Sequence, residues 1–229
     1  MRTWLTILLL GVLQMIAPAP GFAKPLPPGM ITEKVEWTWA EKPQAPNPAL
    51  PNVLLLGDSI TRGYYPEAAE KLAGQANCYL FATSASSGDP RLAGQLHAYF
   101  HMVAVRFTVI HFNNGMHGWG YTDAQYAEGL PGLLQDLRDD APGAKLIWAS
   151  TTPVQNDSET GGATNARIET RNAAAAKLMQ ANHIPIDDQC TLMTAHENLH
   201  NGDVHYTAAG STIQAEQVVN SIDSALRGQ

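Results

Sequence analysis

The sequence predicts an α/β protein, a three-layer α/β/α sandwich built on a five-stranded parallel sheet. Short apolar runs alternate five times with longer stretches of helical pattern, which is typical of β/α units. The first run is continuously apolar, as a strand buried on both faces would be. Polar residues follow four of the runs, where the carboxyl ends of parallel strands would meet at one edge of the sheet.

The predicted strands and helices follow one another along the chain without internal repeats. The strands are expected at 53–56, 78–82, 107–112, 145–149 and, more weakly, 184–187. The helices are expected near 65–74, 91–103, 122–140, 165–182 and 207–226. Thr122 and Asp123 offer N-cap chemistry to the third helix, and Pro142-Gly143 follows its end.

The N-terminus has the pattern of a secretory signal peptide. Met1-Arg2 precedes an apolar run that ends at Ile16, and small residues follow at 21–23. We expect cleavage after Ala23 and a secreted or periplasmic protein, because the run is shorter than the roughly 20 residues of a membrane-spanning helix. Stable membrane insertion after cleavage is not expected.

Residues 24–52 are rich in proline and predict an extended leader that wraps the domain formed by residues 53–229. Residues 35–39 alternate in polarity, which favours packing of a Trp against the body. Removing residues 1–23, whose single charge is Arg2, takes the net charge from −7 to −8. This charge argues against a nucleic-acid partner, which would require a basic face.

The two cysteines are not expected to pair. Cys78 lies on a predicted edge strand and Cys190 just past the opposite edge, whereas a disulfide needs Cα atoms within about 7 Å. No cofactor or metal is expected either, because His196, His200 and His205 match no familiar zinc spacing.

A candidate nucleophile follows the first strand. Ser59 comes between this strand and a helical pattern, near backbone N–H groups that could stabilise an oxyanion. A serine needs a nearby base, and Gly-Asp-Ser after a strand is also a common turn with an N-cap. His205 precedes the last helix, and Asp203 lies two residues before it. Together they predict a Ser-His pair with Asp203 as a candidate orienting acid.

From about Val53 to the last helix, the sequence resembles the SGNH/GDSL hydrolase family. Gly57-Asp58-Ser59-Ile60-Thr61 matches the first block of the family, Gly88 falls at the glycine of the second, and His205 supplies the last. The resemblance implies a flavodoxin-like fold and hydrolysis of esters, commonly acyl groups on sugars or lipids. It also implies an oxyanion hole of the Ser59 and Gly88 N–H groups and an Asn side chain.

Two blocks depart from the family pattern. The third reads Asn113-Asn114 before a glycine, where the family has Gly-x-Asn-Asp; the predicted strand end and the following Gly-x-x-Gly favour Asn113, with Asn114 as the alternative. In the last block the family has Asp-x-x-His, whereas here Gly202 lies three residues before His205 and Asp203 only two. Asp203 is therefore either the orienting group or a surface acid, with a backbone carbonyl holding His205. Asp187 and Asp188 are weaker candidates.

We therefore expect a serine ester hydrolase whose partner is a small-molecule or glycan ester. No apolar lid is evident, which favours short acyl groups on carbohydrate over a lipase or thioesterase activity. A non-hydrolytic protein that binds acylated glycans in the same cleft is the alternative. His117, Trp119 and Tyr121 form either a substrate wall or a packed loop. Arg167 and Arg171, four residues apart, are expected to be solvated or paired near Glu169.

Overall fold

The computed structural model describes residues 29–158 and 162–228. The predicted signal peptide and its cleavage point after Ala23 lie outside these residues. Within the described chain, no helix combines the length and the apolar character needed to cross a bilayer.

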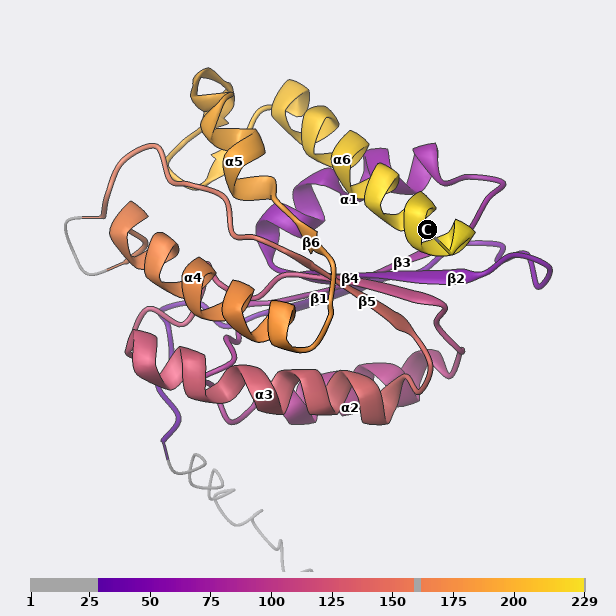
Figure 1. The fold of residues 1–229 in the computed structure, drawn as a ribbon, viewed down its shortest axis with the longest axis horizontal. Helices are drawn as coiled ribbons and strands as arrows, with labels where there is room; N and C mark the ends of the chain where they lie inside the picture. The colour runs from indigo at the N-terminus through magenta and orange to yellow at the C-terminus, as the bar shows by residue number, and fades with distance from the viewer. Residues whose placement is uncertain (1–28, 159–161, 229) are drawn as a thin grey trace, which may run out of the picture.

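The centre of the molecule is a mostly parallel sheet, as the sequence predicts (Figure 1). Its strands lie in the order β1-β3-β2-β4-β5-β6. Their bounds are β1 Thr38–Glu41, β2 Asn52–Gly57, β3 Asn77–Thr83, β4 Val109–Phe112, β5 Lys145–Ala149 and β6 Ile186–Asp187. The five parallel strands β2 to β6 follow the predicted ones. The predicted strand count is wrong by one, because β1 adds an antiparallel strand beside β3.

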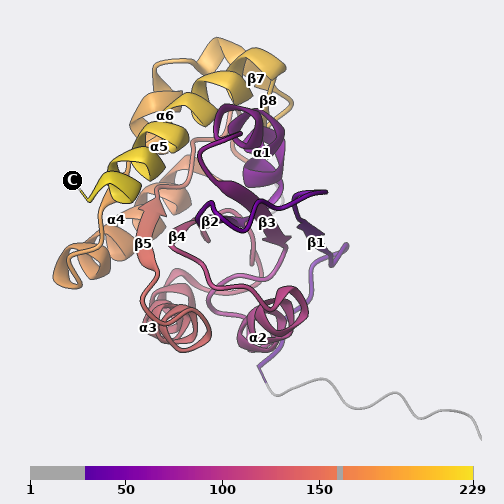
Figure 2. The ribbon, with the colours of Figure 1, turned by 90° about the vertical axis from the view of Figure 1, so that its right-hand side faces the viewer.

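Helices cover both faces of the sheet (Figure 2). They are α1 Ser59–Lys71, α2 Leu92–Val103, α3 Asp123–Asp140, α4 Asn165–Ala181, α5 Gln189–Thr194 and α6 Ala208–Arg227. The helices α1 and α6 pack together on one face, and α3 packs against both α2 and α4 on the other. The third helix has the expected N-cap at Thr122, which forms a capping box with Gln125.

Two hydrophobic clusters fill the space between the sheet and the helix layers. Successive residues of β2 alternate between them: Leu54 and Leu56 pack on the α2–α3 face, and Val53 and Leu55 on the α1–α6 face. All four are essentially buried, and burying each such side chain stabilises the fold by roughly 1.5–3 kcal/mol. Because β2 is buried on both faces, its position in the sheet is fixed. This places its carboxyl end, Gly57, at the start of α1.

The described part of the N-terminal segment lies along the sheet. We call residues 31–41 the strap. Trp37 donates its backbone N–H to Ser84 Oγ at 3.0 Å and accepts from the Ser84 N–H at 3.1 Å, and β1 follows directly. Trp37 also packs on the α1–α6 cluster. The strap is thus joined to the end of β3, just before the loop that carries Gly88.

Both cysteines are free thiols, as predicted. Cys78 is buried in β3, and burial raises its pKa to about 12. The sequence suggested that Cys78 lies on an edge strand. This is wrong, because β1 lies outside β3 in the sheet.

Candidate active site

Ser59 is the first residue of α1 and follows β2 through a tight turn. Asp58 caps the helix, and its carboxylate accepts from the Ile60 N–H at 2.8 Å. A Cβ at Gly57 would lie 2.1 Å from Thr61 Oγ1, so only glycine allows the helix to begin directly after the strand. The helix therefore starts at Ser59, ahead of the predicted residue 65. In the first helical turn the Ser59 N–H has no intrahelical acceptor and remains available as a donor.

His205 approaches Ser59 from the other end of the chain. Its Nε2 atom lies 2.8 Å from Ser59 Oγ. His205 belongs to a small hairpin of β7 (His200–Asn201) and β8 (His205–Tyr206), which turns at Gly202 with a φ of +78°. Because α6 follows this hairpin and packs on α1, packing of the two helices brings the predicted Ser-His pair together.

Asp203 makes its hydrogen bonds outside this pair. Its Oδ1 accepts from Asn156 Nδ2 at 3.0 Å, and its backbone carbonyl accepts from the Gln155 N–H at 2.7 Å. Within the described chain no hydrogen bond joins Asp203 to His205. Asp203 therefore contacts the loop between β5 and α4.

Asp187 and Asp188 are also held elsewhere. Asp187 Oδ2 lies 2.8 Å from Nε2 of His111 on β4, and both side chains are fully buried. Burial alone would raise the pKa of Asp187, but the hydrogen bond with His111 keeps it below its ordinary value. Asp188 caps α5 and accepts from Ser150 Oγ at 2.9 Å.

Gly88 lies where the loop after β3 meets α3. A Cβ there would lie 3.3 Å from the backbone of Gln125, so the glycine allows the loop to pack directly on the first turn of the helix. The turn that contains Gly88 is closed by a hydrogen bond from the Asp89 N–H to the Ser86 carbonyl at 2.8 Å. Among the described residues, the Gly88 N–H has no acceptor.

The two asparagines after β4 have different surroundings. Asn113 is buried, and its amide donates to the Ala149 carbonyl at 2.7 Å and to Thr151 Oγ1 at 3.0 Å, which uses both N–H groups. Asn114 is partly exposed. It donates to the Ala85 carbonyl at 2.9 Å and accepts from the Ser87 N–H, so one of its N–H groups has no acceptor in the described chain. Asn114 is thus tied to the loop of Gly88.

The strap holds the loop that follows these asparagines. Glu33 accepts from the Gly118 N–H at 2.7 Å and the Trp119 N–H at 3.3 Å, and His117 Nδ1 donates to its other oxygen at 2.9 Å. Burial would raise the pKa of Glu33, but these donors hold it below 4.5. Burial would lower the pKa of His117, but Glu33, with a contribution from Asp58, raises it above 6.5.

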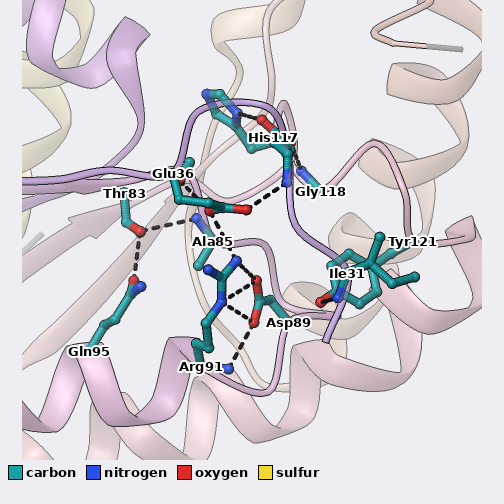
Figure 3. Close-up of polar contacts among 12 residues, drawn as sticks. Ile31, Glu36, Thr83, Ala85, Asp89, Arg91, Gln95, His117, Gly118 and Tyr121 are labelled. Atoms are coloured by element: carbon teal, nitrogen blue, oxygen red, sulfur yellow. Dashed lines mark hydrogen bonds and ion pairs between the residues drawn. The ribbon is translucent and has the colours of Figure 1, made fainter. Parts of the chain in front are cut away.

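The strap also binds the loop of Gly88 (Figure 3). Glu36 accepts from Ser84 Oγ at 2.9 Å and forms an ion pair with Arg91 at 3.0 Å. Arg91 in turn pairs with the buried Asp89, one residue after Gly88. The strap therefore links the two loops that carry the candidate oxyanion donors, a role that the sequence did not reveal.

Arg171 supports the loop after β4 from α4. Its side chain is 1% exposed and donates to the carbonyls of Gly115, His117 and Gly118 at 2.6–3.1 Å. The expected solvated position is wrong for Arg171. No pattern marks it, because three of its acceptors are backbone carbonyls more than fifty residues away and the fourth is the Asp123 carboxylate on another helix.

The aromatic loop after β4 is mostly packed. Tyr121 is 2% exposed, and its hydroxyl accepts from the Ile31 N–H at 2.7 Å. His117 stacks beside Trp119, and its side chain is mostly buried. Trp119 alone is substantially exposed, at 37%.

The described residues contain no group of three His, Cys, Asp or Glu side chains arranged to hold a metal ion. The functional groups at the carboxyl ends of the strands are a serine hydroxyl, an imidazole and several N–H groups. This set suits nucleophilic acyl transfer.

Comparisons with known proteins agree with this chemistry. The sequence pattern of the GDSL-like lipase/acylhydrolase family matches residues 55–213. A search of curated proteins finds no significant match. Among solved structures, the chain resembles a lipase/acylhydrolase from Enterococcus faecalis, with a TM-score of 0.64, 15% identity, and coverage of 76% of this chain and 96% of the other.

Two further structures have the same fold. A carbohydrate acetylesterase from Sinorhizobium meliloti aligns with a TM-score of 0.60 and 11% identity, over 76% of this chain and 99% of the other. An acetyl xylan esterase aligns with a TM-score of 0.57 and 15% identity, over 75% and 99%. At such identities the likeness concerns the fold.

Proposed function

Because the chain belongs to the GDSL-like lipase/acylhydrolase family and is an ester-bond hydrolase, we propose that it removes short acyl groups from carbohydrates, with Ser59 as nucleophile and His205 as its base. The observation that carries this proposal is the 2.8 Å contact between Ser59 Oγ and His205 Nε2, a distance suited to proton transfer. The likeness in fold to two carbohydrate esterases supports the substrate class.

The proposed reaction has two steps. His205 takes the Ser59 proton as Oγ attacks the ester carbonyl carbon, and then gives it to the departing alcohol as the C–O bond breaks. Water attacks the acyl-enzyme with His205 again as base, which releases the acid and restores Ser59.

The oxyanion of each tetrahedral intermediate would accept from the N–H groups of Ser59 and Gly88 and from an asparagine. The hydrogen bonds of the free protein favour Asn114 as that asparagine, since both N–H groups of the Asn113 amide already have acceptors. The sequence-based preference for Asn113 stays a prediction, which mutation of each residue tests.

We also propose that the protein is exported, with residues 1–23 as its signal peptide, residues 24–52 as an N-terminal segment and residues 53–229 as the hydrolase domain. The pattern of Met1-Arg2, the apolar run and the small residues at 21–23 supports export. N-terminal sequencing of the secreted protein tests it, and Lys24 is the expected first residue.

The test of the catalytic proposal is Ser59→Ala. This variant should keep its fold, as measured by circular dichroism, and lose turnover of 4-nitrophenyl acetate by roughly 10³-fold or more. Full activity in the variant would contradict the assignment. Binding of acylated glycans by the wild-type protein without release of acid would instead support the non-hydrolytic alternative.

A further inference from the structure

A pocket of about 470 Å³ opens at the chain segment that leads into His205. Trp119, from the loop after β4, and Asn156, from the loop after β5, contribute to its lining, together with Asp203 and Val204. Since Asp203 and Val204 directly precede His205, at most about 8 Å of chain separates the pocket lining from the proposed base. The volume lies within the roughly 300–1,000 Å³ range of small-molecule sites.

The same pocket is connected to the nucleophile. Ala163 lines it and belongs to a small apolar cluster on which both Ile60 and Val204 pack. Ile60 follows Ser59, and Val204 precedes His205, so one cluster supports the pocket and both proposed catalytic residues. A larger pocket of about 560 Å³ is lined in part by Val154 and Ile168 of the same cluster, but its lining includes neither Trp119 nor the two residues that precede His205.

Trp119 gives the pocket an apolar platform. Its ring is 37% exposed, its Nε1 donates to the Met116 carbonyl at 2.7 Å, and His117 stacks beside it with ring centroids 5.7 Å apart. A ring that is fixed at its edge and open to solvent can pack against a flat ligand with little loss of side-chain entropy.

Asp203 and Asn156 give the pocket its polar side. They hydrogen-bond to each other at 3.0 Å and are otherwise exposed, which leaves carboxylate lone pairs and an amide group for a ligand. Asp157 adds a second carboxylate, and the described lining includes no Lys or Arg. Two carboxylates disfavour a phosphate headgroup and favour a neutral ligand rich in hydroxyl groups.

We propose that this pocket binds the alcohol portion of the substrate, a neutral sugar unit that packs on Trp119 and hydrogen-bonds to Asp203 and Asn156. The inference rests on the proposed function and makes Asp203 a specificity-determining residue instead of the group that orients His205. A carboxylate that orients His205 contributes to hydrolysis of every substrate. A carboxylate that binds the sugar contributes only to hydrolysis of sugar esters.

The experiment compares Trp119→Ala and Asp203→Ala with the wild-type protein on two substrates, partially acetylated xylo-oligosaccharides and 4-nitrophenyl acetate. Each variant should raise KM for the oligosaccharides by about tenfold with kcat within about twofold, because about 1.4 kcal/mol of binding is lost. Both constants for 4-nitrophenyl acetate should stay within about twofold in Asp203→Ala, because its nitrophenyl leaving group carries no free hydroxyl group for Asp203 to bind. Matched controls are Trp39→Ala, at an exposed position of β1, and Asp139→Ala, at an exposed position of α3.

Each contrary outcome has a distinct meaning. Equal losses of kcat on both substrates for Asp203→Ala would overturn the inference and assign Asp203 to His205. A rise of KM for 4-nitrophenyl octanoate but not for the oligosaccharides in Trp119→Ala would assign the pocket to the acyl chain. Unchanged constants on both substrates would show that the pocket does not bind the substrate. Failure of the proposed function itself would appear separately, as full activity of Ser59→Ala on 4-nitrophenyl acetate.

Discussion

His205 Nε2 and Ser59 Oγ lie 2.8 Å apart, although 146 residues separate them along the chain. If His205 is the base, His205→Ala should lower kcat/KM for 4-nitrophenyl acetate by roughly 10³-fold or more, because the serine hydroxyl is a weak nucleophile alone. The matched control is His97→Ala, since the His97 side chain is 75% exposed on α2. Steady-state kinetics near neutral pH provide the measurement, and a loss below tenfold would contradict the role.

The two asparagines after β4 should respond differently to mutation. Asn114→Ala is expected to lower kcat by roughly 10²–10³-fold with little change in KM, because an oxyanion donor acts mainly on the transition state. Asn113→Ala is expected to lower the free energy of unfolding by about 1–3 kcal/mol, because it leaves Ala149 and Thr151 without their buried donor. Kinetics and urea unfolding of both variants distinguish the effects. A large loss of kcat in Asn113→Ala, with little change in Asn114→Ala, would instead identify Asn113 as the oxyanion donor.

Glu33→Gln should make stability depend on pH differently from the wild type. The pKa of Glu33 is lowered, so its contribution is present above 4.5 and lost as pH falls through the folded pKa. The pKa of His117 is raised, so its contribution is present below 6.5 and lost as pH rises through the folded pKa. The loss of unfolding free energy should therefore be about 1.5–3 kcal/mol at pH 5.5 and smaller at pH 9.

Urea unfolding at the two pH values measures this difference, and Glu128→Gln, at an exposed position of α3, is the control. An equal loss at pH 5.5 and pH 9 would mean that the pair with His117 contributes nothing beyond the hydrogen bonds from Gly118 and Trp119.

Arg171→Met should destabilise the protein by about 3–5 kcal/mol, because it removes a buried charge that pairs with Asp123 and leaves the loop carbonyls of Gly115 and His117 without their donor. The control is Lys177→Met, at an exposed position of the same helix, which should change the free energy of unfolding by less than about 0.5 kcal/mol. Chemical denaturation measures both. Similar stability of the two variants would disprove the supporting role of Arg171.

The sequence predicted the elements whose signals are local. A continuous apolar run identified β2, and the residues at its end and before the last helix identified Ser59 and His205. The contacts of Glu33 and Arg171 were not predictable, because they depend on how distant segments dock and on backbone N–H and C=O groups, which carry no side-chain signature. Asp203 shows the same limit: its distance from His205 in sequence is short, yet its carboxylate faces Asn156.

The place of β1 has a consequence for any shortened form of the protein. The matched family region begins at residue 55, whereas β1 supplies the hydrogen-bond partners along the outer side of β3 from Leu80 to Thr83. A chain cut at the family boundary would expose these N–H and C=O groups to other molecules, and strands with unpaired edges promote intermolecular sheet formation. We therefore expect loss of the strap to lower the solubility of the protein.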